Sequence, residues 1–157
     1  MAASGRYTFG MNATETLTAG VPAATSPVVV HSAYDETAIL DAASVPVLTS
    51  PVYFLLTLAA GVATINLAAL TGANGVVDGT GMRVQLLRIK NLGANAMTFS
   101  EGAANGIALA NLPEVVPAGG IFQMFYNDAA PDIAATDRTI DVAGTGTQTA
   151  EVSIWLG

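Results

Sequence analysis

The chain has 157 residues, a length typical of one domain, and 52% of them are hydrophobic. It contains no cysteine, which excludes disulfides, thiol catalysis and thiolate metal ligands. Only 11% of the residues are charged, against about 25% in a typical soluble domain, and five basic residues leave a net charge of −7. So few cations predict neither a nucleic-acid partner nor a membrane partner. The low charge favours a homo-oligomer that buries apolar surface.

Residues 1–50 are mostly small and contain four X-Pro steps, which end at Pro22, Pro27, Pro46 and Pro51. Proline cannot donate to a strand ladder, and it pushes the preceding residue into extended geometry. We therefore predict an extended N-terminal arm with short edge strands near Val28–Ala33 and Thr37–Leu40. The segment Met1–Arg6 lacks a cationic region followed by an apolar run, so we expect no signal peptide.

The few large residues of the arm are spaced as separate anchors rather than along one core face. Tyr7 and Phe9, beside Arg6, are of the types that anchor protein interfaces. We expect the arm to lie across a neighbouring subunit or a capsid surface; the alternative is that these side chains fold back on their own domain. The predicted partner-binding residues are Arg6, Tyr7, Phe9, Leu17, Tyr34 and Leu40.

Residues 51–157 read as short strands separated by Gly and Asn turns, without a convincing helical period. This spacing predicts an all-β domain, either an antiparallel β-sandwich or a jelly-roll-like barrel. The apolar stretch Val52–Leu70 is broken by polar residues and predicts no membrane span. The expected strands are Val52–Ala59, Val62–Leu67, Met82–Asn91, Ala96–Ser100, Ile107–Leu109, Val115–Val116, Ile121–Tyr126, Thr139–Val142 and Ala150–Leu156.

Two of these strands are apolar on both faces. In Met82–Asn91, Val84 and Leu86 share one face, whereas Leu87 and Ile89 share the other. Either a β-bulge shifts the register, or both faces are buried, one of them by a neighbouring subunit. On the second reading, the subunit interface contains Leu87, Ile89, Phe122, Met124 and Tyr126.

Candidate chemistry is sparse, so we expect no enzyme, no catalytic residue, no metal and no cofactor. His31 is the only histidine, and no serine lies in a Gly-x-Ser-x-Gly motif. The densest acidic run extends from Asp128 through Asp132 and Asp137 to Asp141. Its spacing matches no calcium loop, which favours a solvated acidic loop, although cation binding stays open.

Four segments resemble a group of small decoration (cement) proteins of phage capsids. They are Leu55–Leu70, Leu87–Asn95, Pro117–Gly120 and Val152–Gly157. The resemblance implies a β-sandwich or jelly roll that binds the capsid exterior, with the major capsid protein as partner, often as a dimer or trimer. No catalytic residues carry over from such a family. The proline-rich arm does not match it residue by residue.

We therefore expect a structural virion protein on the outside of a phage capsid, with an arm at 1–50 and a sandwich at 51–157. The alternative is a receptor- or glycan-binding module of a virion fibre or cell-surface assembly. Such a module needs exposed aromatic residues in loops, and only Tyr126 and Trp155 are candidates. A small hydrolase is a weaker alternative, because His31 stands alone.

Overall fold

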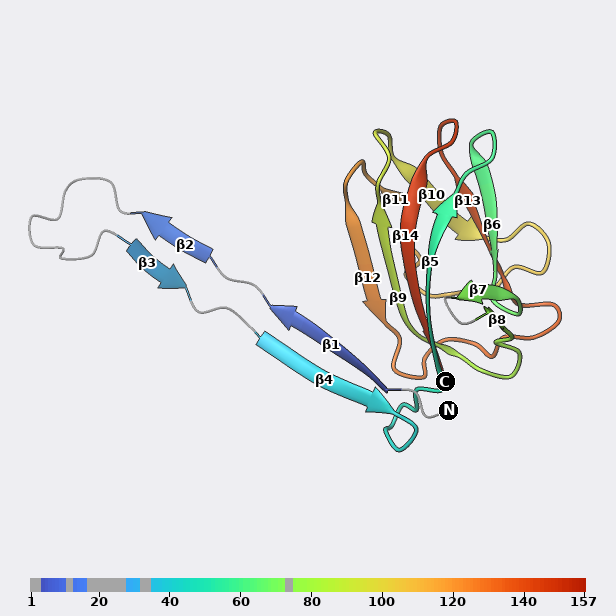
Figure 1. The fold of residues 1–157 in the computed structure, drawn as a ribbon, viewed down its shortest axis with the longest axis horizontal. Coiled ribbons are helices and arrows are strands. Elements are labelled where there is room, and N and C mark those ends of the chain that lie inside the picture. The colour runs from blue at the N-terminus through green and yellow to red at the C-terminus, as the bar shows by residue number, and fades with distance from the viewer. Residues whose placement is uncertain (1–3, 11–12, 17–27, 32–34, 73–74) are drawn as a thin grey trace, which may run out of the picture. The chain divides into compact units, whose positions relative to one another are not determined.

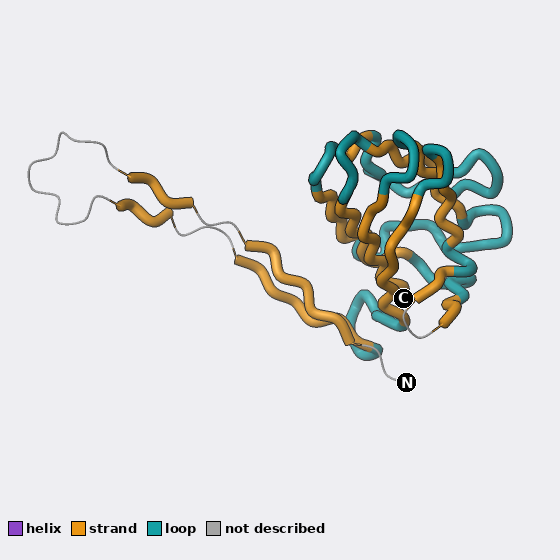
Figure 2. Tube along the Cα trace, turned by 45° about the horizontal axis from the view of Figure 1, so that its top comes forward, coloured by secondary structure: helices purple, strands orange, loops and turns teal. Residues whose placement is uncertain are grey.

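The computed structural model describes residues 4–10, 13–16, 28–31, 35–72 and 75–157. Within these ranges every regular element is a strand, so the all-β prediction is confirmed (Figure 2). The described residues include no helix that is long and apolar enough to cross a membrane. The contacts divide the chain into two units, a smaller one at Gly5–Ile39 and a larger one that contains Leu40–Gly157.

The smaller unit is built from two pairs of strands. Strand β1 (Ser4–Gly10) pairs with β4 (Asp35–Asp41), and β2 (Ala13–Thr16) pairs antiparallel with β3 (Val28–His31) (Figure 1). The β-branched run Val28–Val30 favours an extended backbone. The segment predicted as an extended arm is therefore a two-stranded ribbon over its described residues.

The predicted end of the arm at residue 50 differs from the division at Leu40. Leu40 and Leu48 are buried, with 5% and 0% of their surface exposed, so residues 40–50 belong with the larger unit. The prediction that Leu40 binds a partner is therefore wrong, because its side chain is already buried within the chain. Arg6 is exposed. Leu17, Tyr34 and the side chains of Tyr7 and Phe9 lie outside the described residues.

The larger unit is a jelly roll of two four-stranded antiparallel sheets, ordered β12-β9-β14-β5 and β11-β10-β13-β6 (Figure 1). The first strand pairs with the last, and successive strands pair inward in the same way: β5 with β14, β6 with β13, β9 with β12, and β10 with β11. This nested pairing, rolled over one core, defines the jelly roll. A small hairpin, β7 (Leu70–Gly72) with β8 (Gly75–Val77), lies between β6 and β9 in the chain. The strands of the two sheets are β5 (Ser50–Thr57), β6 (Val62–Asn66), β9 (Val84–Asn91), β10 (Met97–Glu101), β11 (Val115–Val116), β12 (Ile121–Phe125), β13 (Thr139–Ala143) and β14 (Thr149–Leu156).

The core lies between the two sheets and follows from the two-residue period of each strand. On β14 the side chains of Val152, Ile154 and Leu156 are fully buried, as their alternation predicts. The facing sheet contributes Phe99 and Val142. Burial of such side chains stabilises a fold by about 1.5–3 kcal/mol each.

A β-bulge in β9 decides which of its side chains enter the core. Trp155 pairs with Leu86, but the next residue of β14, Leu156, pairs with Val84, so Gln85 has no partner position. The extra residue turns Val84 to the same face as Leu87, while Leu86 faces outward. Of the two readings left open by the sequence, the structure shows the bulge.

The predicted subunit interface is corrected by this register. Leu87 and Ile89 are fully buried in the core, and Tyr126 is only 4% exposed. Phe122 and Met124 pair with Ile89 and Leu87, so they share the inward face and pack against the core. All five side chains contribute to the sandwich interior, and the residues between them on β9 and β12 face outward.

Candidate functional site

The acidic residues of the loop after β12 do not converge. Asp132 is paired with Arg83, whose Nε lies 2.6 Å from its Oδ1, and Asp137 accepts a hydrogen bond of 2.8 Å from the Thr136 hydroxyl. Among the described residues, no three His, Cys, Asp or Glu side chains are placed to hold a metal ion. The side chain of His31 lies outside the described residues.

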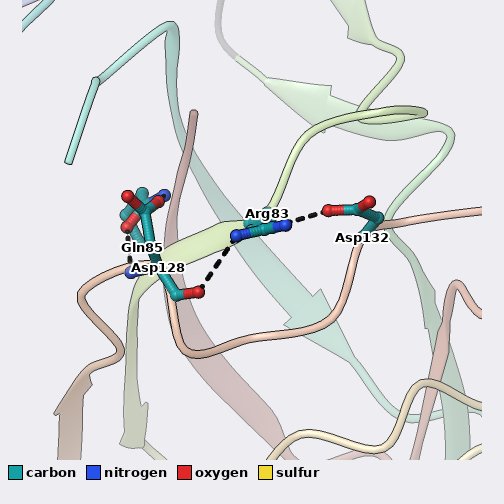
Figure 3. A network of polar contacts seen from close by, with 4 residues as sticks. All are labelled: Arg83, Gln85, Asp128 and Asp132. Carbon is teal, nitrogen blue, oxygen red and sulfur yellow. Dashed lines mark hydrogen bonds and ion pairs between the residues drawn. The ribbon is translucent and has the colours of Figure 1, made fainter.

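The polar contacts around Arg83 stabilise the turn that follows β12 (Figure 3). Arg83 also donates to the backbone carbonyl of Asp128 at 3.2 Å, and the paired Asp132 raises the pKa of the guanidinium. The Gln85 side chain accepts from the Asp128 backbone N–H at 3.0 Å and donates to the Asp128 carboxylate. Asn127 and Asp128 have φ of 47° and 61°, a left-handed turn that these bonds hold in place. The bulged Gln85 thus fixes the exit of β12.

A cavity of 470 Å³ lies beside the edge strands β5 and β6. Phe54, Leu55, Ile65 and Leu70 contribute most of its apolar lining, and no titratable side chain is among the described residues that line it. Thr64, Asn66 and Thr71 also line the cavity, so its described lining is part polar but supplies no general acid or base.

The outer face of the sheet β12-β9-β14-β5 has a different character, and we call it the aromatic face. Its strand register aligns the outward side chains in rows that cross all four strands. The first row is Ile121, Lys90, Glu151 and Leu55; the second is Gln123, Arg88, Ser153 and Tyr53; the third is Phe125, Leu86, Trp155 and Pro51. Large apolar side chains thus flank charged ones on one flat surface.

Several large side chains of the aromatic face are left in water. Tyr53, Leu55 and Ile121 are 55%, 59% and 59% exposed. In the third row Leu86 faces outward between the partly buried Phe125 and Trp155, and it is only 4% exposed. Tyr53, Leu55 and Ile121 lie on the two edge strands, β5 and β12, and the charged side chains of β9 and β14 lie between them. Apolar surface left in water costs about 25 cal/mol per Å², so burial of these exposed side chains against a partner would be favourable.

The centre of the aromatic face holds two cations around one carboxylate. Arg88 Nη1 and Lys90 Nζ each lie 4.0 Å from Glu151 Oε2. These contacts are long and partly exposed, so they contribute about 1 kcal/mol or less to the fold. Their charges are therefore available for a partner.

On the outer face of the second sheet, here called the polar face, Thr64, Thr98 and Asp141 form hydrogen bonds within the chain. Val62 and Val115, on the edge strands of this sheet, are 60% and 55% exposed. The Thr64 hydroxyl and the Ala103 backbone N–H each donate to the Asp141 carboxylate at 2.8 Å. These bonds hold the pKa of Asp141 below its usual value, and the bond from the Ala103 N–H has the larger effect. The Thr98 hydroxyl donates to the Ala143 carbonyl at 3.4 Å. Small polar side chains that already form hydrogen bonds within the chain are typical of a solvated surface.

The sequence singles out β9 and β12 as interface strands but not the residues that face outward. Arg88, Lys90 and Ile121 occupy the aromatic face, whereas the predicted residues lie beneath it. The signal is the change of apolar period at Leu86 and Leu87, for which a bulge is one of the two interpretations; the predicted interface residues depend on the other interpretation.

Comparisons with protein-family models, curated proteins and solved structures found no match to this chain. The resemblance to phage decoration proteins therefore stays a prediction, and the geometry of the chain carries the functional argument.

Proposed function

We propose that this chain is a structural virion protein that binds and stabilises the outer surface of a phage capsid. The observation that carries the proposal is the pairing of a self-contained jelly roll with a separate two-stranded ribbon at Gly5–Ile39. A two-stranded ribbon alone is at best marginally stable in water. Its strands gain stability when they lie against another surface, which a shell of repeated subunits supplies.

The surface chemistry of the jelly roll supports the same proposal. The described acidic side chains near Arg83 and on the polar face are engaged in structural contacts rather than gathered in a pocket. The aromatic face, in contrast, presents apolar side chains suited to protein contact. A charge-poor protein of this kind is suited to permanent assembly.

The receptor- or glycan-binding alternative has less support from the placement of aromatic residues. Tyr126 is only 4% exposed and belongs to the core. Trp155 lies on a strand in the middle of a flat sheet rather than in a loop. Neither residue forms the exposed aromatic loop that such a module needs.

Particle binding tests the proposal directly. Full-length protein is mixed with phage shells that lack it and sedimented through a density gradient, and the temperature of genome release is measured with a DNA-binding dye. We expect co-sedimentation at a fixed ratio and release at a higher temperature. Protein that stays entirely in the soluble fraction contradicts the proposal.

A deletion of residues 2–39 separates the ribbon from the jelly roll. We expect the shortened chain to keep a β-type circular dichroism spectrum and a cooperative thermal transition but to lose the shell. If the deleted chain binds the shell as well as the full chain, the ribbon is not the attachment element. If it does not fold, the ribbon contributes to the sandwich, and the proposed division of labour is wrong.

A further inference from the structure

The order of residues along the first row of the aromatic face is self-complementary. Strands β9 and β14 occupy the centre of the sheet, and β12 and β5 occupy its edges. A half-turn about an axis parallel to the strands, midway between β9 and β14, exchanges the two central strands and the two edge strands. It also keeps every row at the same height, so each row meets its own reversed copy.

We propose that two copies of this chain pack face to face through the aromatic face, related by that twofold axis. In the first row the axis brings Lys90 over Glu151 of the partner subunit, and Ile121 over Leu55 of the partner subunit. In the second row it brings Arg88 over Ser153 of the partner subunit and Tyr53 over Gln123 of the partner subunit. The first row therefore pairs opposite charges and apolar side chains, twice in each contact, and the second row places polar side chains opposite Arg88 and Tyr53.

The charge distribution favours a second copy at this face over other faces. The chain has a net charge of −7, so most contacts between copies bring like charges together. The aromatic face carries both signs of charge, so Lys90 of one copy can meet the carboxylate of Glu151 of the partner subunit, while Arg88 adds one positive charge to each copy. On the polar face Asp141 is the central charge, and its oxygens already accept two hydrogen bonds.

The size of the aromatic face is sufficient for a modest interface. Strands about 4.8 Å apart with a rise of about 3.3 Å per residue give roughly 19 Å across the four strands and about 26 Å along the three strands of eight residues, while β12 has five residues. The relief of the side chains raises the accessible area above this flat figure, toward the lower end of the roughly 800 Å² per partner that specific interfaces bury. We therefore expect a dimer that dissociates on dilution.

Charge reversal tests the twofold arrangement, with sedimentation equilibrium as the measurement of the dissociation constant. Lys90→Glu places carboxylates opposite Glu151 of the partner subunit, and Glu151→Lys places cations opposite Lys90 of the partner subunit. We expect each single variant to weaken the dimer by at least about tenfold, because like charges meet twice across the contact. Thermal melts monitor the fold, since each reversal also removes a weak contact within the chain.

The decisive measurement is a mixture of the two single variants. Across the proposed axis, each introduced glutamate meets a lysine and each introduced lysine meets a glutamate, so the mixture is expected to form one-to-one heterodimers about as tightly as the wild-type chain. Contacts within one chain cannot produce this rescue. The control is Glu101→Lys on β10 of the other sheet, an exposed reversal that is expected to leave the dimer unchanged.

The inference is overturned if the wild-type chain stays monomeric at high micromolar concentration, if both single variants dimerise normally, or if their mixture shows no rescue. It goes beyond the proposed function, because pairing is measured on the free protein and attachment is measured on shells. Failure of one therefore leaves the other standing.

Discussion

The two outer faces of the jelly roll are built on antiparallel sheets of four strands each, yet they treat their side chains differently. On the polar face Thr64 and Asp141 satisfy one another at 2.8 Å. On the aromatic face Tyr53 and Ile121 stay more than half exposed, and the charges of Arg88, Lys90 and Glu151 are only loosely paired. One core thus supports a face whose central carboxylate is held by hydrogen bonds and a face whose charges are loosely paired between exposed apolar side chains.

The two faces differ because each strand turns particular side chains inward. Removing one of these inward side chains is expected to have the largest effect on stability. Leu87→Ala removes a fully buried side chain of the core, so we expect the free energy of unfolding to fall by about 2–5 kcal/mol. Its neighbour Arg88 faces outward, and Arg88→Ala is expected to cost about 1 kcal/mol or less. Urea denaturation at equal protein concentration measures both, and equal losses contradict the assigned register of β9.

A matched pair of edge residues compares the two faces directly. Leu55 on β5 and Val62 on β6 are 59% and 60% exposed and lie on edge strands of the two sheets. We expect Leu55→Asp to weaken self-association by about tenfold, or roughly 1.4 kcal/mol, because it places a carboxylate among apolar contacts. Val62→Asp is expected to leave it unchanged. If the two variants behave alike in sedimentation, the faces do not differ as interfaces.

A substitution at Tyr126 is expected to have a smaller effect on stability. Its side chain lies on the inward side of the sheet that carries the aromatic face. Its buried hydroxyl has no hydrogen-bond partner among the described residues, and burial raises its pKa to about 12. Tyr126→Phe removes this unsatisfied group, so we expect a gain of up to about 1 kcal/mol in stability at neutral pH.

The same residue predicts a response to alkali. A raised pKa in the folded state means that ionisation opposes folding, so the contribution of neutral Tyr126 is intact below pH 10.0 and is lost as the pH rises toward about 12. Thermal melts from neutral to alkaline pH should therefore show the advantage of the Phe variant growing above pH 10.0. A constant difference between the two proteins contradicts a buried hydroxyl.

The polar face gives the smallest expected change. The pKa of Asp141 lies below its usual value of 3.8, because the Ala103 N–H and the Thr64 hydroxyl favour the charged carboxylate. Its contribution is present above that value and is lost as the pH falls through the lowered pKa. Asp141→Asn should reduce slightly the loss of thermal stability between neutral pH and acid. An unchanged acid response means that other carboxylates dominate.

The sequence predicts the strands of the two large sheets, because alternation on β14 and Gly-rich turns are local signals. The expected strand Ile107–Leu109 is wrong, since these residues form no strand, and the strands β1, β2, β7 and β8 are not predicted. The sequence does not predict that Leu86 faces outward, because the bulge at Gln85 depends on pairing with Trp155 and Leu156, far along the chain. The candidate site could not be predicted from the sequence for the same reason. Its rows combine side chains from strands that become neighbours only when the roll closes, such as Lys90 and Glu151.

The edges of the jelly roll determine how far association can grow. An open strand edge can recruit further strands without limit, which leads to fibres. Here the edge strand β5 carries Pro51, and the edge strand β11 is only two residues long and is followed directly by Pro117. Proline offers no N–H for a new ladder, so polymerisation along these edges is discouraged. The other two edge strands, β6 and β12, contain no proline, so the prolines limit growth by strand addition at one edge of each sheet.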